Sequence, residues 1–211
     1  MNHPVYLSDR KKARGNAPRR SIPVRRILVL LLLLTLLSFG LGYSTDALLT
    51  LLERRSHPRP YPETVQSVCE TFGVPPAVLY TAMKELSGFD SGKNGPGDKR
   101  GLFQMTPEQF RQICQSRFGT DPDPGLLYDP EHSIRAGAAY LCGLYDDYLS
   151  WDTVLAVCAA GKEAVDTWLK SPASTDDYGG LLCDKIPERQ ARRTVARWLG
   201  TKEKYETLYT D

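Results

Sequence analysis

The chain has 211 residues, which leaves room for one ordinary domain with extensions and excludes several large domains. Its formal net charge of +2 is uninformative by itself, but the charge is unevenly distributed. Residues 1–26 carry eight Lys and Arg residues against a single acidic residue, Asp9, and the remainder of the chain is mildly acidic. The basic excess is therefore confined to one end.

Residues 1–26 combine prolines and polar residues with too little apolar content to pack, which predicts a disordered basic cytoplasmic tail. Residues 27–43 follow as an uncharged, leucine-rich segment at the lower end of the length that spans a bilayer as a helix. This segment has no polar face, so we predict a transmembrane signal anchor. Basic residues on its N-terminal side orient the N-terminus toward the cytoplasm, with the rest of the chain outside the cell membrane.

A cleaved signal peptide is the competing interpretation, because small residues at Ser38, Gly40 and Gly42 offer a cleavage site. We favour the uncleaved, single-pass anchor because the basic leader is longer than that of a signal peptide. Either interpretation exports the domain. Beside an apolar segment, the basic tail indicates membrane topology, and we expect no nucleic-acid partner.

The pattern after the apolar segment is helical and shows almost no alternation typical of strands. Residues 44–60 predict a short stalk that starts as an amphipathic helix and breaks at Pro58 and Pro60. Residues 61–209 predict an all-α domain. Its expected helices cover residues 62–72, a segment from Pro75 through Leu86, a helix that starts after a capping box at Thr106, and residues 133–148, 151–161, 162–169 and 187–208.

Five cysteines lie on the side predicted to be exported, where disulfides persist. Their odd number and wide spacing support neither a zinc cluster nor a thioredoxin-like motif. Two disulfides with one thiol left over remain an alternative, and we favour buried free cysteines. No metal motif, Gly-x-Ser-x-Gly element or paired-carboxylate spacing is present, so we expect no metal and no cofactor. The cysteines are Cys69, Cys114, Cys142, Cys158 and Cys183.

The run from Val78 to Pro107 resembles the catalytic segment of the soluble lytic transglycosylase (SLT) family. An apolar helix leads into Glu85-Leu86-Ser87-Gly88-Phe89-Asp90, and after a polar loop comes Gly101-Leu102-Phe103-Gln104-Met105-Thr106-Pro107. The family signature is Glu-Ser-x-Phe-Asn/Asp, a loop, then Gly-Leu-Met-Gln-Ile-x-Pro. The resemblance implies a lysozyme-like helical domain of the goose-type lysozyme/SLT kind, behind an N-terminal transmembrane helix.

Further elements extend the resemblance over residues 61–209. Residues 129–141 are similar to the family's Asp-Pro-x-x-Asn-Ile-x-x-Gly-x-x-Tyr-Leu element, and residues 155–161 to its Ala-Tyr-Asn-Ala-Gly element. The departures fall where function is implied. Cys158 and Ala159 replace a tyrosine and an asparagine that line the family's active site, and Glu163 replaces a usual glycine.

The family's chemistry, as the resemblance implies, depends on one glutamic acid that acts as acid and then as base on peptidoglycan glycan strands. Leu86 occupies that position, and leucine cannot transfer a proton. Glu85 is the first surrogate, but one residue corresponds to about 100° of rotation on a helix, so the two side chains point differently. We interpret Glu85 as a solvated carboxylate that only a helix bulge would redirect. The other candidate acids are Asp90, Asp98, Glu108 and Glu163.

Substrate contacts implied by the resemblance involve Ser87, Phe89, Gln104 and Tyr140. Gln104 either bonds to sugar or peptide groups or is a buried residue that holds its loop. Tyr140 either forms the floor of a groove or packs.

Two functions follow from these residues. The first is a membrane-anchored, extracytoplasmic pseudoenzyme that binds glycan strands or a cell-wall or envelope protein. The alternative is an active lytic transglycosylase that uses Glu85 or another nearby acid. A hydrolytic muramidase would face the same missing acid.

Overall fold

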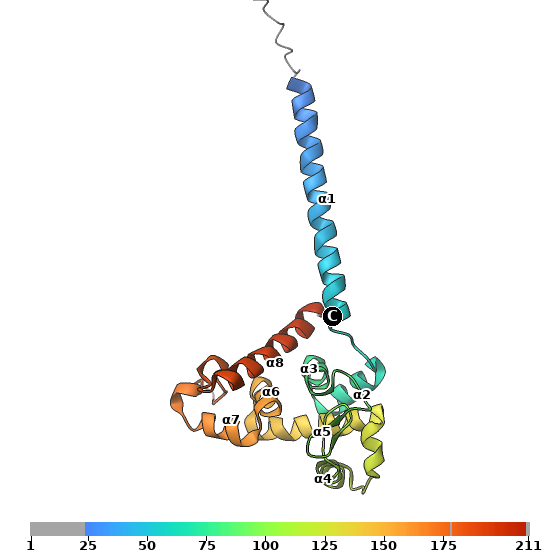
Figure 1. Ribbon diagram of the computed structural model, residues 1–211, viewed down its shortest axis with the longest axis vertical. Coiled ribbons are helices and arrows are strands. Elements are labelled where there is room, and N and C mark those ends of the chain that lie inside the picture. The colour runs from blue at the N-terminus through green and yellow to red at the C-terminus, as the bar shows by residue number, and fades with distance from the viewer. Residues whose placement is uncertain (1–23, 178, 210–211) are drawn as a thin grey trace, which may run out of the picture. The chain divides into compact units, whose positions relative to one another are not determined.

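The computed structural model describes residues 24–177 and 179–209, so most of the predicted tail, residues 1–23, lies outside the described residues. The chain divides into two units, one up to Leu49 and one from Thr50 onward. Helix α1, Val24–Ser56, contains the segment predicted to span a membrane (Figure 1). In the described part of the chain, no helix has both the length and the apolar character needed to cross a membrane.

The second unit is built from short helices, which confirms the prediction of a mainly helical domain. Antiparallel pairing of β1 with β2 adds a small hairpin inside the loop between α3 and α4. The elements are α2 Pro62–Phe72, α3 Pro76–Ser87, β1 Asn94–Gly95, β2 Lys99–Arg100, α4 Pro107–Phe118, η1 Pro124–Tyr128, α5 Pro130–Tyr148, α6 Trp151–Ala160, α7 Lys162–Leu169, η2 Pro172–Ser174, η3 Cys183–Lys185 and α8 Arg189–Leu208.

Local chemistry sets several helix boundaries. The capping box predicted before α4 is present, because the Thr106 hydroxyl accepts from the Gln109 amide and the Gln109 side chain accepts from the Thr106 amide. Helix α5 begins earlier than the predicted Ser133. Asp129 accepts from the backbone N–H of His132 and Pro130 occupies the first helical position, which together start the helix there.

The core lies where α3, α5 and α6 meet, and α8 closes it from one side by packing on α3 and α6 (Figure 1). Leu79, Met83, Ile134 and Leu155 are fully buried there. Burial of such side chains is the main favourable contribution to folding, at about 1.5–3 kcal/mol each. The same packing brings the end of α3, the hairpin and the start of α7 to one side of α5.

Residues 50–60 belong to the second unit and pack on α8. The Arg54 guanidinium donates to the Leu208 carbonyl at 3.3 Å, and Glu53 pairs with Lys204 at 2.6 Å. The Tyr205 hydroxyl donates to the Pro58 carbonyl at 3.0 Å. The end of the segment that the sequence predicts as a stalk is therefore docked on the domain.

All five cysteines are free thiols in this structure. Cys69 and Cys114 are buried, and Cys142, Cys158 and Cys183 are half-buried. The expectation of buried free cysteines thus holds for Cys69 and Cys114, whereas the other three thiols are only partly buried.

Candidate functional site

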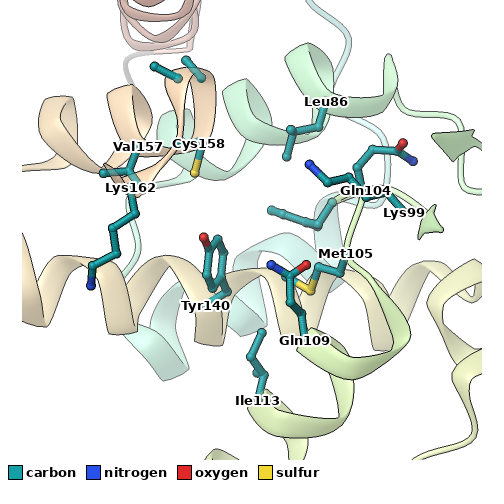
Figure 2. Close-up of a pocket in the computed structure, with 14 residues that line it drawn as sticks. Leu86, Lys99, Gln104, Met105, Gln109, Ile113, Tyr140, Val157, Cys158 and Lys162 are labelled. Carbon is teal, nitrogen blue, oxygen red and sulfur yellow. The ribbon is translucent and has the colours of Figure 1, made fainter. Parts of the chain in front are cut away.

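A cavity of about 500 Å³ opens on the side of the domain where α3, the hairpin, α4, α5, α6 and α7 converge (Figure 2). Its volume lies in the range of small-molecule sites. Apolar and neutral polar side chains make most of its wall. The lining residues are Leu86, Lys99, Phe103, Gln104, Met105, Gln109, Ile113, Tyr140, Val157, Cys158, Ala159, Ala160, Gly161 and Lys162.

Leu86 projects into this cavity from the last turn of α3 (Figure 2). The turn is held in place because the Lys93 ammonium donates to the Leu86 carbonyl at 2.8 Å, an arrangement that suits the negative end of a helix. Gly88 adopts a left-handed conformation and ends α3 directly afterwards. The position that resemblance assigns to the acid thus faces the cavity, and its side chain there is apolar.

Glu85 points to a different part of the molecule. Its carboxylate pairs with Arg197 at 2.9 Å and accepts from the Thr201 hydroxyl at 2.8 Å, and both partners lie on α8. The side chain is 10% exposed, which corrects the expectation of a solvated carboxylate. Helix α3 is regular from Pro76 to Ser87, so no bulge turns Glu85 toward the cavity.

The other candidate acids, Asp90, Asp98, Glu108 and Glu163, are not among the residues that line the cavity either. Asp90 accepts from the Gly92 amide at 2.9 Å, and Asp98 pairs with Arg100 at 2.8 Å. Glu108 pairs with Arg111 in the first turn of α4. Glu163 lines a neighbouring cavity of about 580 Å³, which shares Ala159 and Ala160 with the first.

Tyr140 and Cys158 face each other across the cavity, with the hydroxyl of one directed toward the thiol of the other (Figure 2). Burial, with a smaller contribution from Cys158, raises the pKa of Tyr140 to about 12. Burial also raises the pKa of Cys158 to about 12. Both groups are therefore neutral near neutral pH, and neither supplies a base.

Gln104 lines the cavity, but its amide group is directed away from it (Figure 2). The side-chain nitrogen donates to the Gly101 carbonyl at 2.8 Å and to the Lys93 carbonyl at 3.1 Å. The side chain is buried, and its oxygen lies against Gly95 of β1 so closely that a β-carbon there would collide with it. This geometry favours the interpretation in which Gln104 holds the hairpin loop.

Ser87 and Phe89 are not among the residues that line the cavity. The Ser87 hydroxyl donates to the Met83 carbonyl at 2.9 Å and accepts from the Phe89 amide at 3.1 Å. These bonds satisfy backbone groups at the end of α3. In this structure the two residues shape the helix terminus that presents Leu86.

Sequence reasoning missed three polar residues of the cavity wall, namely Lys99, Gln109 and Lys162. Lys99 lies on β2 within the polar loop, and Lys162 is the first residue of α7. The sequence predicts Gln109 as a capping residue, and the structure confirms that role. The polarity of the loop was a signal for Lys99, but the direction of its side chain depends on the hairpin.

Solved structures of lytic transglycosylases share this fold. The 70-kDa soluble lytic transglycosylase of Escherichia coli aligns with a TM-score of 0.64 at 22% identity, over 74% of this chain and 25% of that one. A complex of the 70-kDa soluble lytic transglycosylase with bulgecin A aligns with a TM-score of 0.65 at 22% identity, over 75% of this chain and 26% of that one. An inactive mutant of Slt from Pseudomonas aeruginosa aligns with a TM-score of 0.63 at 23% identity, over 72% of this chain and 24% of that one. The class is thus a lysozyme-like helical domain.

The family model named Transglycosylase SLT domain matches residues 63–179, more than half of the chain, and the chain belongs to this family. Membrane-bound lytic murein transglycosylase C of Edwardsiella ictaluri is 30% identical over 74% of this chain and 49% of that protein. The protein of the same name from Serratia proteamaculans is 31% identical over 46% of this chain and 27% of that protein. The chain thus spans about half the length, or less, of these curated relatives.

Proposed function

We propose that this domain is a lytic transglycosylase-like module that binds peptidoglycan glycan strands without the family's acid–base cleavage. One observation carries the proposal: of the fourteen described residues that line the cavity, none is Asp or Glu, and Leu86 occupies the position that resemblance assigns to the acid. General acid and base groups must reach the reacting atoms within hydrogen-bond distance or through one water. The cavity offers no carboxyl group for that role.

The groups that remain suit binding better than proton transfer. Tyr140 and Cys158 hold their protons near neutral pH, and the Lys162 ammonium is paired with Asp147, so these groups supply no base. The Tyr140 hydroxyl and the Gln109 amide nitrogen make no hydrogen bonds within the described residues. An amide donor and a hydroxyl beside apolar surface are groups that recognise sugar hydroxyls and rings.

The alternative is an active lytic transglycosylase that uses Glu85 or another nearby acid. Its best support is Glu163, which is exposed at the first turn of α7 in the cavity next to the first. Glu85 has less support because Arg197 and Thr201 engage both of its oxygens.

Digestion of purified sacculi by the full-length chain, followed by mass spectrometry for anhydromuropeptides, separates the two functions. We expect sacculi to retain the protein and to release no anhydromuropeptides. Release that disappears in Glu85→Gln or Glu163→Gln would identify the acid and overturn the proposal.

The Glu85→Gln variant has a second expected effect, which is structural. Loss of the carboxylate leaves Thr201 with a weaker acceptor and Arg197 without its ionic partner. The free energy of unfolding should therefore fall by about 1–3 kcal/mol. Chemical denaturation measures this change. Glu163→Gln is the matched control, because Glu163 is exposed and its substitution should change stability by less than about 0.5 kcal/mol.

We also propose that residues 27–43 anchor the chain in the cell membrane, with residues 1–26 in the cytoplasm and the domain outside. Ile27, Leu28, Leu32 and Leu36 are all more than 40% exposed on α1, and the E. ictaluri relative is named as membrane-bound. Membrane fractions washed with alkaline carbonate should keep the protein, and its mass should be that of the intact chain. Loss of about the first forty residues would contradict the anchor and indicate a cleaved signal peptide.

A further inference from the structure

We propose that the cavity recognises a sugar that carries a free carboxylate, and that Lys99 is the residue that binds this carboxylate. The inference rests on the proposed function, in which the cavity holds a glycan strand. Beyond the proposed function, it specifies that the bound sugar is negatively charged and that Lys99 binds this charge.

The wall of the cavity carries an uncompensated positive charge. Two lysines and no acids are among the described lining residues. Lys162 is already neutralised, because it pairs with Asp147 at 2.8 Å and extends away from the cavity (Figure 2). The Lys99 side chain makes no hydrogen bond or ion pair within the described residues, and its ammonium group points toward Leu86 (Figure 2). One positive charge therefore faces the concave surface.

The hairpin explains why this charge is unpaired. Lys99 lies between Asp98 and Arg100, and these two neighbours pair with each other at 2.8 Å. The other lysine of the loop, Lys93, donates to the carbonyl of Leu86. Lys99 itself is held opposite Gly95 by the strand register. The carboxylate of the adjacent Asp98 is thus engaged by Arg100, and Lys99 is directed into the cavity (Figure 2).

Lys99 is surrounded by both apolar and polar groups of the cavity wall. Leu86, Met105 and Ile113 supply apolar surface, and Gln109 and Tyr140 supply polar groups that have capacity for further hydrogen bonds. A simple inorganic anion would leave most of a 500 Å³ cavity unfilled. A sugar ring that bears a carboxylate matches both the apolar surface and the charge of Lys99. The ring covers the apolar surface, and the carboxylate accepts hydrogen bonds from the ammonium group.

The acidic residues of the neighbouring cavity determine at which end of the site the carboxylate-bearing sugar binds. Ala159 and Ala160 line both cavities, and the second one also contains Glu163 and Glu188. A carboxylate would be repelled there and attracted at Lys99. The carboxylate-bearing sugar is therefore expected at the α3 and hairpin end of the site.

Isothermal titration of the full-length chain with a soluble glycan-strand fragment tests the inference. Two forms of the fragment are compared, one with free carboxylates and one with the carboxylates converted to neutral amides. Lys99→Gln should weaken binding of the free-carboxylate form about tenfold and leave binding of the amidated form unchanged. Added salt should weaken binding of the first form only. Lys170→Gln, which removes an exposed lysine outside the cavity, is the matched control and should bind like wild type.

The possible outcomes are distinguishable. If Lys99→Gln weakens neither fragment, or weakens both equally, the carboxylate inference is wrong while glycan binding stands. If neither fragment binds the wild-type chain, the proposed function fails, and the inference fails with it. Circular dichroism of each variant shows whether the fold is kept, and Lys99→Met provides a second neutral replacement.

Discussion

Replacement of Leu86 by glutamate should give the domain measurable cleavage of sacculi, about 10²-fold or more above the wild-type background. The side chain at this position lines the cavity (Figure 2), so a carboxyl group there would face a bound glycan strand. Mass spectrometry of released anhydromuropeptides measures the gain. Leu86→Gln is the matched control because it introduces a polar group of the same size that cannot transfer a proton.

The neighbouring Lys99 should limit this gain. An ammonium group near the introduced carboxyl stabilises its ionised form, which lowers its pKa and leaves less of the protonated acid. On strands whose carboxylates are amidated, which do not depend on Lys99 for binding, the double variant Leu86→Glu, Lys99→Gln should therefore cleave faster than the single variant, and its rate should persist to higher pH. If neither variant releases product, Cys158 and Ala159 have altered the site beyond what one carboxyl group restores.

The largest loss of stability is expected for Gly101→Ala. Gly101 has a φ of +72°, and a β-carbon there would lie 1.9 Å from the Leu127 carbonyl oxygen, which is backbone and cannot rotate away. The turn that follows carries Phe103 and Gln104 into the cavity wall. We expect the variant to lose roughly 4 kcal/mol or more, or to fail to fold, as measured by urea denaturation and by the yield of soluble protein.

Gly97→Ala is the control that separates strain from collision. Gly97 also has a φ of +72°, but a β-carbon there would meet nothing within 4 Å. Its substitution should cost only the left-handed conformation, about 1–2 kcal/mol. Equal losses at the two positions would mean that the contact with Leu127 is not the cause.

Much of the fold could be predicted because its determinants are local. The limits of α2 and α7 follow from apolar spacing and from the glycines that precede or follow them, and the capping box at Thr106 was recognisable from four consecutive residues. Helix α5 begins at Pro130, ahead of the apolar stripe that predicts its start at Ser133, because a proline at the first helical position starts the helix.

The candidate site was predictable only in part. The absence of a carboxyl group at Leu86 is a property of the sequence, and the rotation of a helix by about 100° per residue already separated Glu85 from it. The partners of the Glu85 carboxylate were not predictable, because Arg197 and Thr201 lie more than a hundred residues further along the chain. No local pattern reports such a pair.

The sequence by itself determined the helical domain, its family resemblance and the apolar residue at the position of the acid, since each depends on short-range spacing. Only the tertiary structure decided which charged groups reach the cavity. Helix α8 engages Glu85, Arg100 engages Asp98, and the hairpin directs Lys99 inward. Charged side chains pair when they are close in space, so the net charge of the cavity depends on how the helices and the hairpin pack and cannot be taken from the composition.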